Sequence, residues 1–230
     1  MKEQTLRWPG GWARLGPWRG HEDVAYLSLG ADRPPETAFV ERCLQALRRQ
    51  GYHRVITSAL APGESLPFVD TGFEVHERLH LLEHRMGDLP TPPHRTRRAR
   101  RGDRPAILEI DARAFDDFWH IDDTGFDHAV RATPNTRVRV GETDDAVVAY
   151  AVTGRAGEQG FLQRLAVDPD QHRAGWGRAL VADGLRWLRR HGVTRTLVNT
   201  QLENEAALSL YRACGFAELP VGLTVLARAL

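Results

Sequence analysis

Two glycines, Gly175 and Gly177, stand one residue apart in the stretch LAVDPDQHRAGWGRALV, just before the apolar spacing of a helix begins. The unpaired amides at the start of a helix, together with the helix dipole, create a binding site for an anion. Glycine has no Cβ, so the backbone of this loop can approach a phosphate closely. Arg173 and Arg178 could pair with further phosphate oxygens. The pattern predicts a phosphate-binding loop, although Gly-x-Gly also occurs in loops that bind no anion.

A tyrosine, Tyr211, lies in a second predicted helix, within the stretch NEAALSLYRACGF that Gly215 ends. Its hydroxyl can donate a proton to a leaving group, but an aromatic residue on a helix face can equally serve packing alone.

The glycine loop does not match two other kinds of phosphate-binding motif. No Lys-Ser or Lys-Thr follows the glycines, as in a P-loop, and the third glycine and later acidic residue of a dinucleotide site are missing.

Alternating strands and helices position these residues in the second half of the chain. Residues 136–140, 146–153, 161–167 and 195–200 have the apolar pattern of strands, and residues 176–192 and 203–213 have that of helices. AILEIDARAF is expected to pass from a strand into a helix, and GLTVLARAL to form a last strand. This order predicts an α/β fold, with a mixed central sheet flanked by helices.

The motif strand–(Gln/Arg)-x-x-Gly-x-Gly/Ala–helix resembles the pyrophosphate loop of the GNAT superfamily of acetyl-CoA-dependent N-acetyltransferases. Here it contains His172 through Gly177 (HRAGWG), with His172 where the family usually has Gln or Arg. LAVDPD before the loop, and Asn204, Ala207, Leu210, Tyr211, Gly215 and Phe216 after it, are also typical of that family. The resemblance covers about residues 106–230.

The resemblance implies that acetyl-CoA is the cosubstrate and lies between two splayed parallel strands, residues 161–167 and 195–200. The first strand would bind the pantetheine arm, the glycine loop the pyrophosphate, and Asn204 the cofactor arm. Tyr211 would be the catalytic residue that protonates the departing thiolate. The implied cofactor-binding residues are Leu165, Ala166, Val167, His172, Arg173, Ala174, Gly175, Trp176, Gly177, Arg178 and Asn204.

The general base is not evident, because the two splayed strands offer only Gln163, Arg164, Asn199 and Gln201. The open candidates are a water relay and a set of side chains elsewhere, Asp116, Asp117, His120, Asp122, Asp123 and Glu203. No cysteine stands where a covalent intermediate would form, and no metal site is expected. We therefore expect direct attack by a primary amine, from an unidentified small molecule or protein, in a ternary complex. The alternative is a non-catalytic acyl-CoA-binding sensor.

The first half of the chain repeats the end of the second. FVERCLQALRRQGYHRVIT resembles LVADGLRWLRRHGVTRTLV, which suggests an internal duplication, with chance similarity of two amphipathic units as the alternative. Pro34 and Glu36 stand in place of the two loop glycines, Ala61 in place of Asn204 and Phe68 in place of Tyr211. The first half is also expected to be too short for the family's early strands. It is therefore predicted to be a degenerate partial copy that binds no acetyl-CoA.

The predicted domains are residues 1–89 and 105–230, joined by a solvated linker at 90–104 that is rich in Pro and Arg. Its basic tract could alternatively bind nucleic acid. The 230 residues carry a net charge of +1, so no nucleic-acid or membrane partner is expected from charge. Two distant cysteines and the lack of a long apolar run predict a soluble cytoplasmic protein. The sequence leaves the oligomeric state open.

Overall fold

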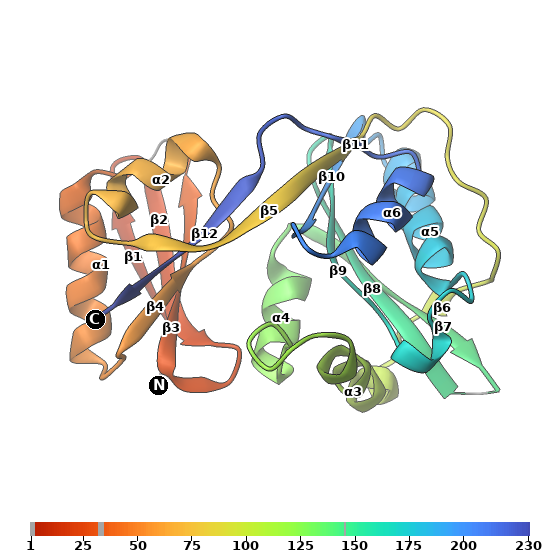
Figure 1. Ribbon diagram of the computed structural model, residues 1–230, viewed down its shortest axis with the longest axis horizontal. Coiled ribbons are helices and arrows are strands. Elements are labelled where there is room, and N and C mark those ends of the chain that lie inside the picture. Colours follow the sequence, from red (N-terminus) through yellow and green to blue (C-terminus); the bar gives the residue numbers. More distant parts are fainter. Residues whose placement is uncertain (1–2, 32–34, 145) are drawn as a thin grey trace. The chain divides into compact units, whose positions relative to one another are not determined.

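The computed structural model describes residues 3–31, 35–144 and 146–230. Two compact units make up the chain (Figure 1). The first contains Met1–Leu81, Asn199–Glu203 and Leu219–Leu230, and the second contains Leu82–Val198 and Asn204–Glu218. This division differs from the predicted boundaries, because the last residues of the sequence belong to the first unit and strand β5 contributes residues to both.

The second unit contains the predicted mixed sheet, with the strand order β5-β10-β9-β8-β7-β6. Strands β7, β8 and β9 are antiparallel, and β10 is parallel to β9. Its elements are the end of β5 (Glu74–His84), β6 (Arg97–Arg98), η1 (Arg101–Asp103), α3 (Arg104–Ala114), α4 (Asp123–Arg131), β7 (Asn135–Thr143), β8 (Ala146–Ala156), β9 (Gln159–Val167), η2 (Pro169–Gln171), α5 (Trp176–Arg190), most of β10 (Arg195–Gln201), α6 (Glu205–Ala213) and β11 (Ala217–Glu218).

Helices cover both faces of this sheet, α3 and α4 on one face and α5 and α6 on the other (Figure 1). The alternation of side chains along β8 explains the two layers. Tyr150 and Val152 pack in the cluster under α3, whereas Ala149 and Ala151 pack under α5. The predicted α/β fold with a mixed, helix-flanked sheet is thus confirmed.

The prediction that AILEIDARAF begins as a strand is wrong, because α3 is helical from Arg104. Ile107, Ile110 and Asp111 recur at helical spacing and form its buried face. The presence of the charged Asp111 among these core positions interrupts the apolar stripe that would have identified the helix from sequence.

The pairing of β9 with its parallel partner β10 ends before either strand does, since β10 itself continues from Leu197 to Gln201. The ladder runs from the pair Gln159–Arg195 to the pair Phe161–Leu197, while β9 itself continues to Val167. A bulge places Gln163 opposite the junction of Val152 and Thr153 on β8. Beyond Phe161, the β10 side of β9 is therefore available for another partner.

The segment 90–104 was predicted to be a solvated linker. This prediction is wrong, because the segment packs on the second unit. Strand β6 pairs with β7. Arg97 forms ion pairs of 2.6 Å with both Asp103 and Glu142, and Arg139 donates a 3.1 Å hydrogen bond from its Nε to the hydroxyl of Thr96. These contacts hold the segment against β7.

The first unit has the strand order β1-β2-β3-β4-β12-β5. Its elements are β1 (Gln4–Trp8), β2 (Gly11–Trp18), β3 (His21–Ala31), α1 (Thr37–Arg49), β4 (Arg54–Thr57), α2 (Pro62–Val69), the first part of β5 and β12 (Leu223–Ala229). The expectation that this half lacks early strands is wrong, because three antiparallel strands precede α1. Strand β12 lies between β4 and β5 and is antiparallel to both.

The two units share local geometry at the repeated positions. Gly72 (φ 82°) and Gly215 (φ 91°) follow α2 and α6 in the left-handed conformation that glycine adopts readily. In each case the next residue, Phe73 or Phe216, donates its amide to the carbonyl of the residue five positions earlier, Phe68 or Tyr211. The same two ring pairs are also in contact. Pro34, which the alignment compares with a loop glycine, lies outside the described residues.

Candidate functional site

The N-terminus of α5 has no side-chain cap. Gly175 is its N-cap residue, and the amide of Ala179 makes the first helical hydrogen bond, to the Gly175 carbonyl at 3.0 Å. By contrast, α4 and α6 are capped by the side chains of Asp122 and Asn204. The amides of the first turn of α5, Trp176 to Arg178, therefore remain available to an external anion.

The local structure requires a glycine at position 175, and the lack of a side chain on Gly177 allows a close approach to α6. Gly175 has φ 92°, and a Cβ there would lie 3.0 Å from Pro93 Cγ and 3.4 Å from His94 Nε2. A Cβ on Gly177 would lie 2.9 Å from Leu210 Cδ2 of α6. The absence of side chains thus brings the loop close to α6, and it also brings residues 93–94 onto the loop.

The contact between residues 93–94 and the loop was missed when this segment was predicted to be a linker. His94 Nε2 donates a hydrogen bond to the Ala174 carbonyl at 2.6 Å. The His94 imidazole also stacks on the Trp176 indole, with ring centroids 4.3 Å apart and planes 26° apart. The segment 93–94 therefore fixes the backbone just before the start of α5, where Arg173 (φ 62°) and Gly175 both have left-handed conformations.

The predicted pantetheine-binding residues lie on β9 beyond its ladder with β10. Leu165 and Val167 pack at the edge of the cluster that contains Trp176, while Ala166 is buried on the opposite face under α3. The Val167 carbonyl accepts a 3.2 Å hydrogen bond from His172 Nε2. His172 thus links the end of β9 to the start of the loop, whereas the exposed side chains of Arg173 and Arg178 extend from it.

Tyr211 is buried on α6, where 6% of the residue is exposed. Its ring contacts Phe216 and packs in a cluster with Leu162, next to Leu165. Burial raises the pKa of Tyr211 to about 12, although the positive charge of Arg164 opposes the shift. The hydroxyl therefore stays protonated at neutral pH, which is the state that a proton donor needs.

Half of the six candidate bases already serve structural roles. The Asp116 carboxylate accepts the amides of Phe118 and Trp119, at 3.0 and 2.9 Å, and Asp122 caps α4. Asp123 forms an ion pair with Arg104. Of the other candidates in the loop after α3, Asp117 is exposed and His120 is half-buried. Glu203 belongs to the first unit.

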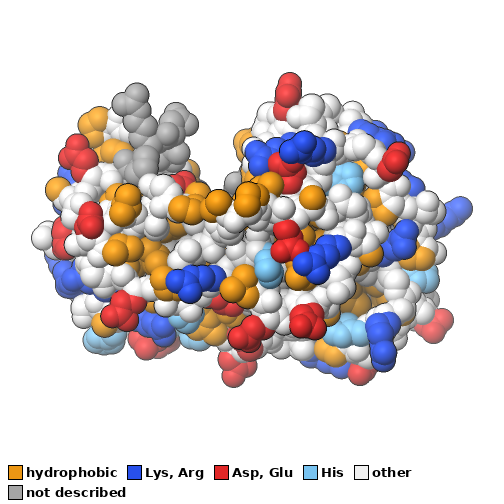
Figure 2. All heavy atoms as spheres, turned by 45° about the horizontal axis from the view of Figure 1, so that its top comes forward, with side chains coloured by type: hydrophobic (Ala, Val, Ile, Leu, Met, Phe, Trp, Pro, Cys, Tyr) orange, Lys and Arg blue, Asp and Glu red, His pale blue; other side chains and the backbone are white. Residues whose placement is uncertain are grey.

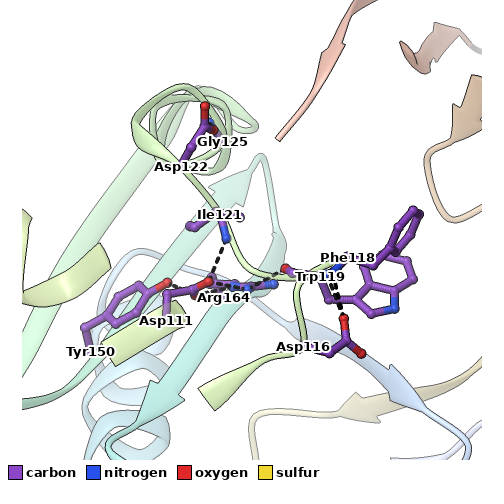
Figure 3. A network of polar contacts seen from close by, with 9 residues as sticks. All are labelled: Asp111, Asp116, Phe118, Trp119, Ile121, Asp122, Gly125, Tyr150 and Arg164. Carbon is purple, nitrogen blue, oxygen red and sulfur yellow. Dashed lines mark hydrogen bonds and ion pairs between the residues drawn. The ribbon is translucent and has the colours of Figure 1, made fainter. Parts of the chain in front are cut away.

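A buried ionic network lies beside these residues and was not predicted (Figure 3). The Asp111 carboxylate accepts bonds of 2.7 and 2.6 Å from Nε and Nη2 of Arg164, and one of 2.5 Å from the Tyr150 hydroxyl. Burial and the Asp111 charge raise the pKa of Tyr150 well above its usual range, so its hydroxyl remains a donor. Sequence reasoning considered Arg164 only as a base and therefore overlooked it as an ion-pair partner.

On the face shown in Figure 2, acidic and basic side chains are interspersed. No helix among the described residues combines the length and apolar character that crossing a bilayer requires. Within the same residues, no three His, Cys, Asp or Glu side chains cluster as a metal site would require.

Known proteins resemble this chain both in sequence and in fold. Residues 104–216 match the acetyltransferase (GNAT) family. Over the whole chain, the fold is similar to a GCN5-related N-acetyltransferase from Kribbella flavida, with a TM-score of 0.64, 16% identity, and coverage of 98% of this chain and 89% of that one. A tandem GNAT protein from the clavulanic acid biosynthesis pathway has a TM-score of 0.67 at 14% identity, with 96% and 79% of the two chains covered.

Two sequence relatives are more similar. The chain is 31% identical, over 119 residues, to a ribosomal protein bS18 alanine N-acetyltransferase from Salmonella typhimurium, covering 52% of this chain and 78% of the relative. It is 31% identical over 131 residues to a mycothiol acetyltransferase from Saccharomonospora viridis, of which it spans only 42%, with 50% of this chain covered. The chain therefore belongs to the acetyltransferase (GNAT) family.

Proposed function

We propose that the protein transfers an acetyl group from acetyl-CoA to a primary amine. The observation that carries this proposal is the uncapped start of α5, together with the part of β9 that is no longer paired with β10. Free amides and an absent Cβ suit a pyrophosphate, and an available strand edge suits the amides of a pantetheine arm. The residues from Leu165 to Val167 and from His172 to Arg178 would hold acetyl-CoA, with Asn204 nearby.

Asn204 has a restricted role in this proposal. Its side-chain oxygen accepts the Ala207 amide at 3.0 Å and so caps α6. Only the NH₂ group of the side chain is then left to donate a hydrogen bond to the cofactor arm.

Tyr211 supplies the acid in the proposed reaction. The amine nitrogen forms a bond to the acetyl carbon, and the bond from that carbon to sulfur breaks. The departing thiolate takes the proton of the Tyr211 hydroxyl, and the excess proton on the amine passes to water or to a side chain of the loop after α3. Solvent then returns a proton to the Tyr211 phenolate. A backbone amide of β9 can stabilise the negative oxygen that develops on the acetyl group.

Direct attack of the amine on acetyl-CoA is consistent with the protonation state of the two cysteine thiols. Burial raises the pKa of Cys43 to about 12 and that of Cys214 to about 11. Because the thiolate is the nucleophilic form, neither side chain is suited to carry the acetyl group. A ternary complex is therefore the simplest mechanism that the second unit can support.

The acceptor is best sought among amines like those of the relatives. A peptide with an N-terminal alanine is the first probe, because one relative is named for acetylating an alanine of a ribosomal protein. Peptide lysines and small primary amines complete the panel. Thiol release from acetyl-CoA measures turnover, and calorimetry measures acetyl-CoA binding. Binding with turnover on at least one amine supports the enzyme; binding without turnover on any would favour an acyl-CoA sensor, and no binding would refute both.

A further inference from the structure

The buried pair of Asp111 and Arg164 is unusual for its place in the fold. Asp111 is fully buried, and only 10% of the Arg164 side chain is exposed. Replacing a buried ion pair with apolar residues of similar volume is often neutral or stabilising, so such a pair is weak support for a purely stabilising role. Its geometry, however, is specific, because the guanidinium grips both carboxylate oxygens at once.

The same two side chains hold the loop that follows α3. Arg164 Nη2 donates to the Trp119 carbonyl at 2.8 Å, and the Ile121 amide donates to Asp111 Oδ1 at 2.8 Å. The guanidinium also lies over the ring of Phe115, 3.5 Å from its centroid. Residues 115–121 belong to no helix or strand, so these contacts, rather than a regular backbone ladder, fix the loop.

The loop displays two aromatic rings. The side chains of Phe118 and Trp119 lie next to each other and point away from the Asp111–Arg164 pair (Figure 3). Their ring planes meet at 85°, with centroids 5.2 Å apart. Both residues are half-buried, and the Asp116 carboxylate fixes their backbone. The loop thus carries two adjacent aromatic residues and is anchored at several points, although its backbone is irregular.

Arg164 also stands next to the proposed reaction centre. It precedes Leu165 on β9, and its positive charge opposes the rise in the pKa of Tyr211. Arg164 therefore joins the strand proposed to bind the cofactor to the loop that carries Phe118 and Trp119. Neither the family match nor the relatives assign a role to it.

We propose that Arg164 is a positioning residue that holds the loop 115–121 as the acceptor wall of the site, with Phe118 and Trp119 facing the amine. This inference rests on the acetyl transfer proposed above. Arg164 does not touch the reacting atoms; it acts through the loop, which it fixes against β9. Loss of its bidentate hydrogen bonds would make the loop 115–121 more mobile, while the glycine loop and the binding of its cosubstrate would be unaffected.

The test compares Arg164→Lys with Tyr150→Phe. Lysine keeps the charge but cannot bind both carboxylate oxygens and the Trp119 carbonyl together. Tyr150→Phe removes a hydrogen bond to the same carboxylate and leaves the bonds from Arg164 to the loop in place. It is therefore a matched control for disturbance of the buried network. Asp111→Asn, which keeps the shape and removes the charge, replaces Arg164→Lys if that variant does not fold.

Three measurements decide the outcome. In Arg164→Lys, amide hydrogen exchange in residues 115–121 and KM for the best amine of the panel should both rise about tenfold, as expected from losing one hydrogen bond to a charged group. The acetyl-CoA affinity should stay within about twofold. Tyr150→Phe should change neither the exchange nor KM.

The inference would be overturned by unchanged exchange in the loop, or by faster exchange with an unchanged KM. Equal changes in the two variants would also overturn it, since they would show a general loss of packing. Failure of the wild type to acetylate any amine would be a different result, because it refutes the proposed function, and the acceptor role with it. The exchange data alone would then decide whether Arg164 anchors the loop.

Discussion

The hydroxyl of Tyr211 is the chemical difference between this residue and Phe68, which has the same backbone contact and ring partner in the first unit. Phe68 is fully buried without a hydroxyl, so a phenyl ring is compatible with this kind of helix end. This natural comparison makes Tyr211→Phe a conservative test of the proposed acid.

We expect Tyr211→Phe to lower kcat by about 10²- to 10⁴-fold, the usual contribution of a general acid. Acetyl-CoA affinity should barely change, because the lost proton matters mainly in the transition state. Steady-state kinetics and calorimetry on the same preparation measure both. A decrease in kcat smaller than about threefold would mean that Tyr211 only packs.

The high pKa of Tyr211 also predicts a pH dependence of stability. Burial raises the pKa from 10.0 to about 12, so the folded state holds this proton more tightly than the unfolded state. The corresponding stability is fully present below pH 10 and is lost as the pH rises from 10 towards 12. Denaturant unfolding between pH 9 and 11 should therefore show a smaller alkaline loss in Tyr211→Phe than in the wild type. Equal losses would show that this residue is not the titrating group.

At the scale of elements, the start of α5 is the part of the site that sequence spacing predicted best. Gly-x-Gly before an amphipathic run predicted a turn into a helix, because the left-handed conformation of Gly175 and the helical periodicity are local properties. The contacts of His94 on this loop were not predictable, since the two segments meet 80 residues apart in sequence. The partners Asp111 and Arg164 are 53 residues apart and were missed for the same reason.

We expect Gly177→Glu to abolish acetyl-CoA binding, because the new carboxylate would occupy the start of α5 and repel a phosphate. Gly87→Glu is the matched control, since a Cβ at Gly87 has no neighbour within 4 Å. Calorimetry measures affinity, and circular dichroism checks that both variants are folded. A folded Gly177→Glu protein with unchanged affinity would refute the proposed pyrophosphate loop.

His94→Ala should weaken acetyl-CoA binding by about two- to tenfold, the effect of one lost hydrogen bond. The loop would lose the bond to the Ala174 carbonyl that holds it in its binding conformation. His191→Ala is the control, because His191 makes a comparable 2.8 Å bond to the Trp187 carbonyl at the other end of α5. An equal loss of affinity in both variants would show that helix stability, rather than loop geometry, is responsible.

At the scale of the whole molecule, we interpret the shared order of strands and helices in the two units as an internal duplication. The first unit was harder to predict from sequence. Its early strands are joined by short turns, such as the one at Arg19 and Gly20, both with positive φ, which lack the usual Asn-Gly or Asp-Gly signal.

We predict that one acetyl-CoA binds per chain. Glu36, which the alignment compares with Gly177, is the N-cap residue of α1, and a carboxylate at the start of that helix would repel a phosphate. Phe68 likewise provides no proton. Calorimetry on the full chain measures the stoichiometry, and two equivalents per chain would refute the interpretation of the first unit as a degenerate copy.

Strand β12 has a consequence for how a ribosome must make this protein. The Thr57 hydroxyl of β4 bonds to the amide of Leu226 on β12, 169 residues later in the sequence. At ~5–20 residues per second, the nascent first unit waits roughly 10 to 30 s for the strand that fills the gap between β4 and β5. All residues of the second unit are synthesised before that strand. The unit whose synthesis begins first is therefore the one whose folding ends last, and in the meantime its two open strand edges are exposed to chaperones and to other nascent chains.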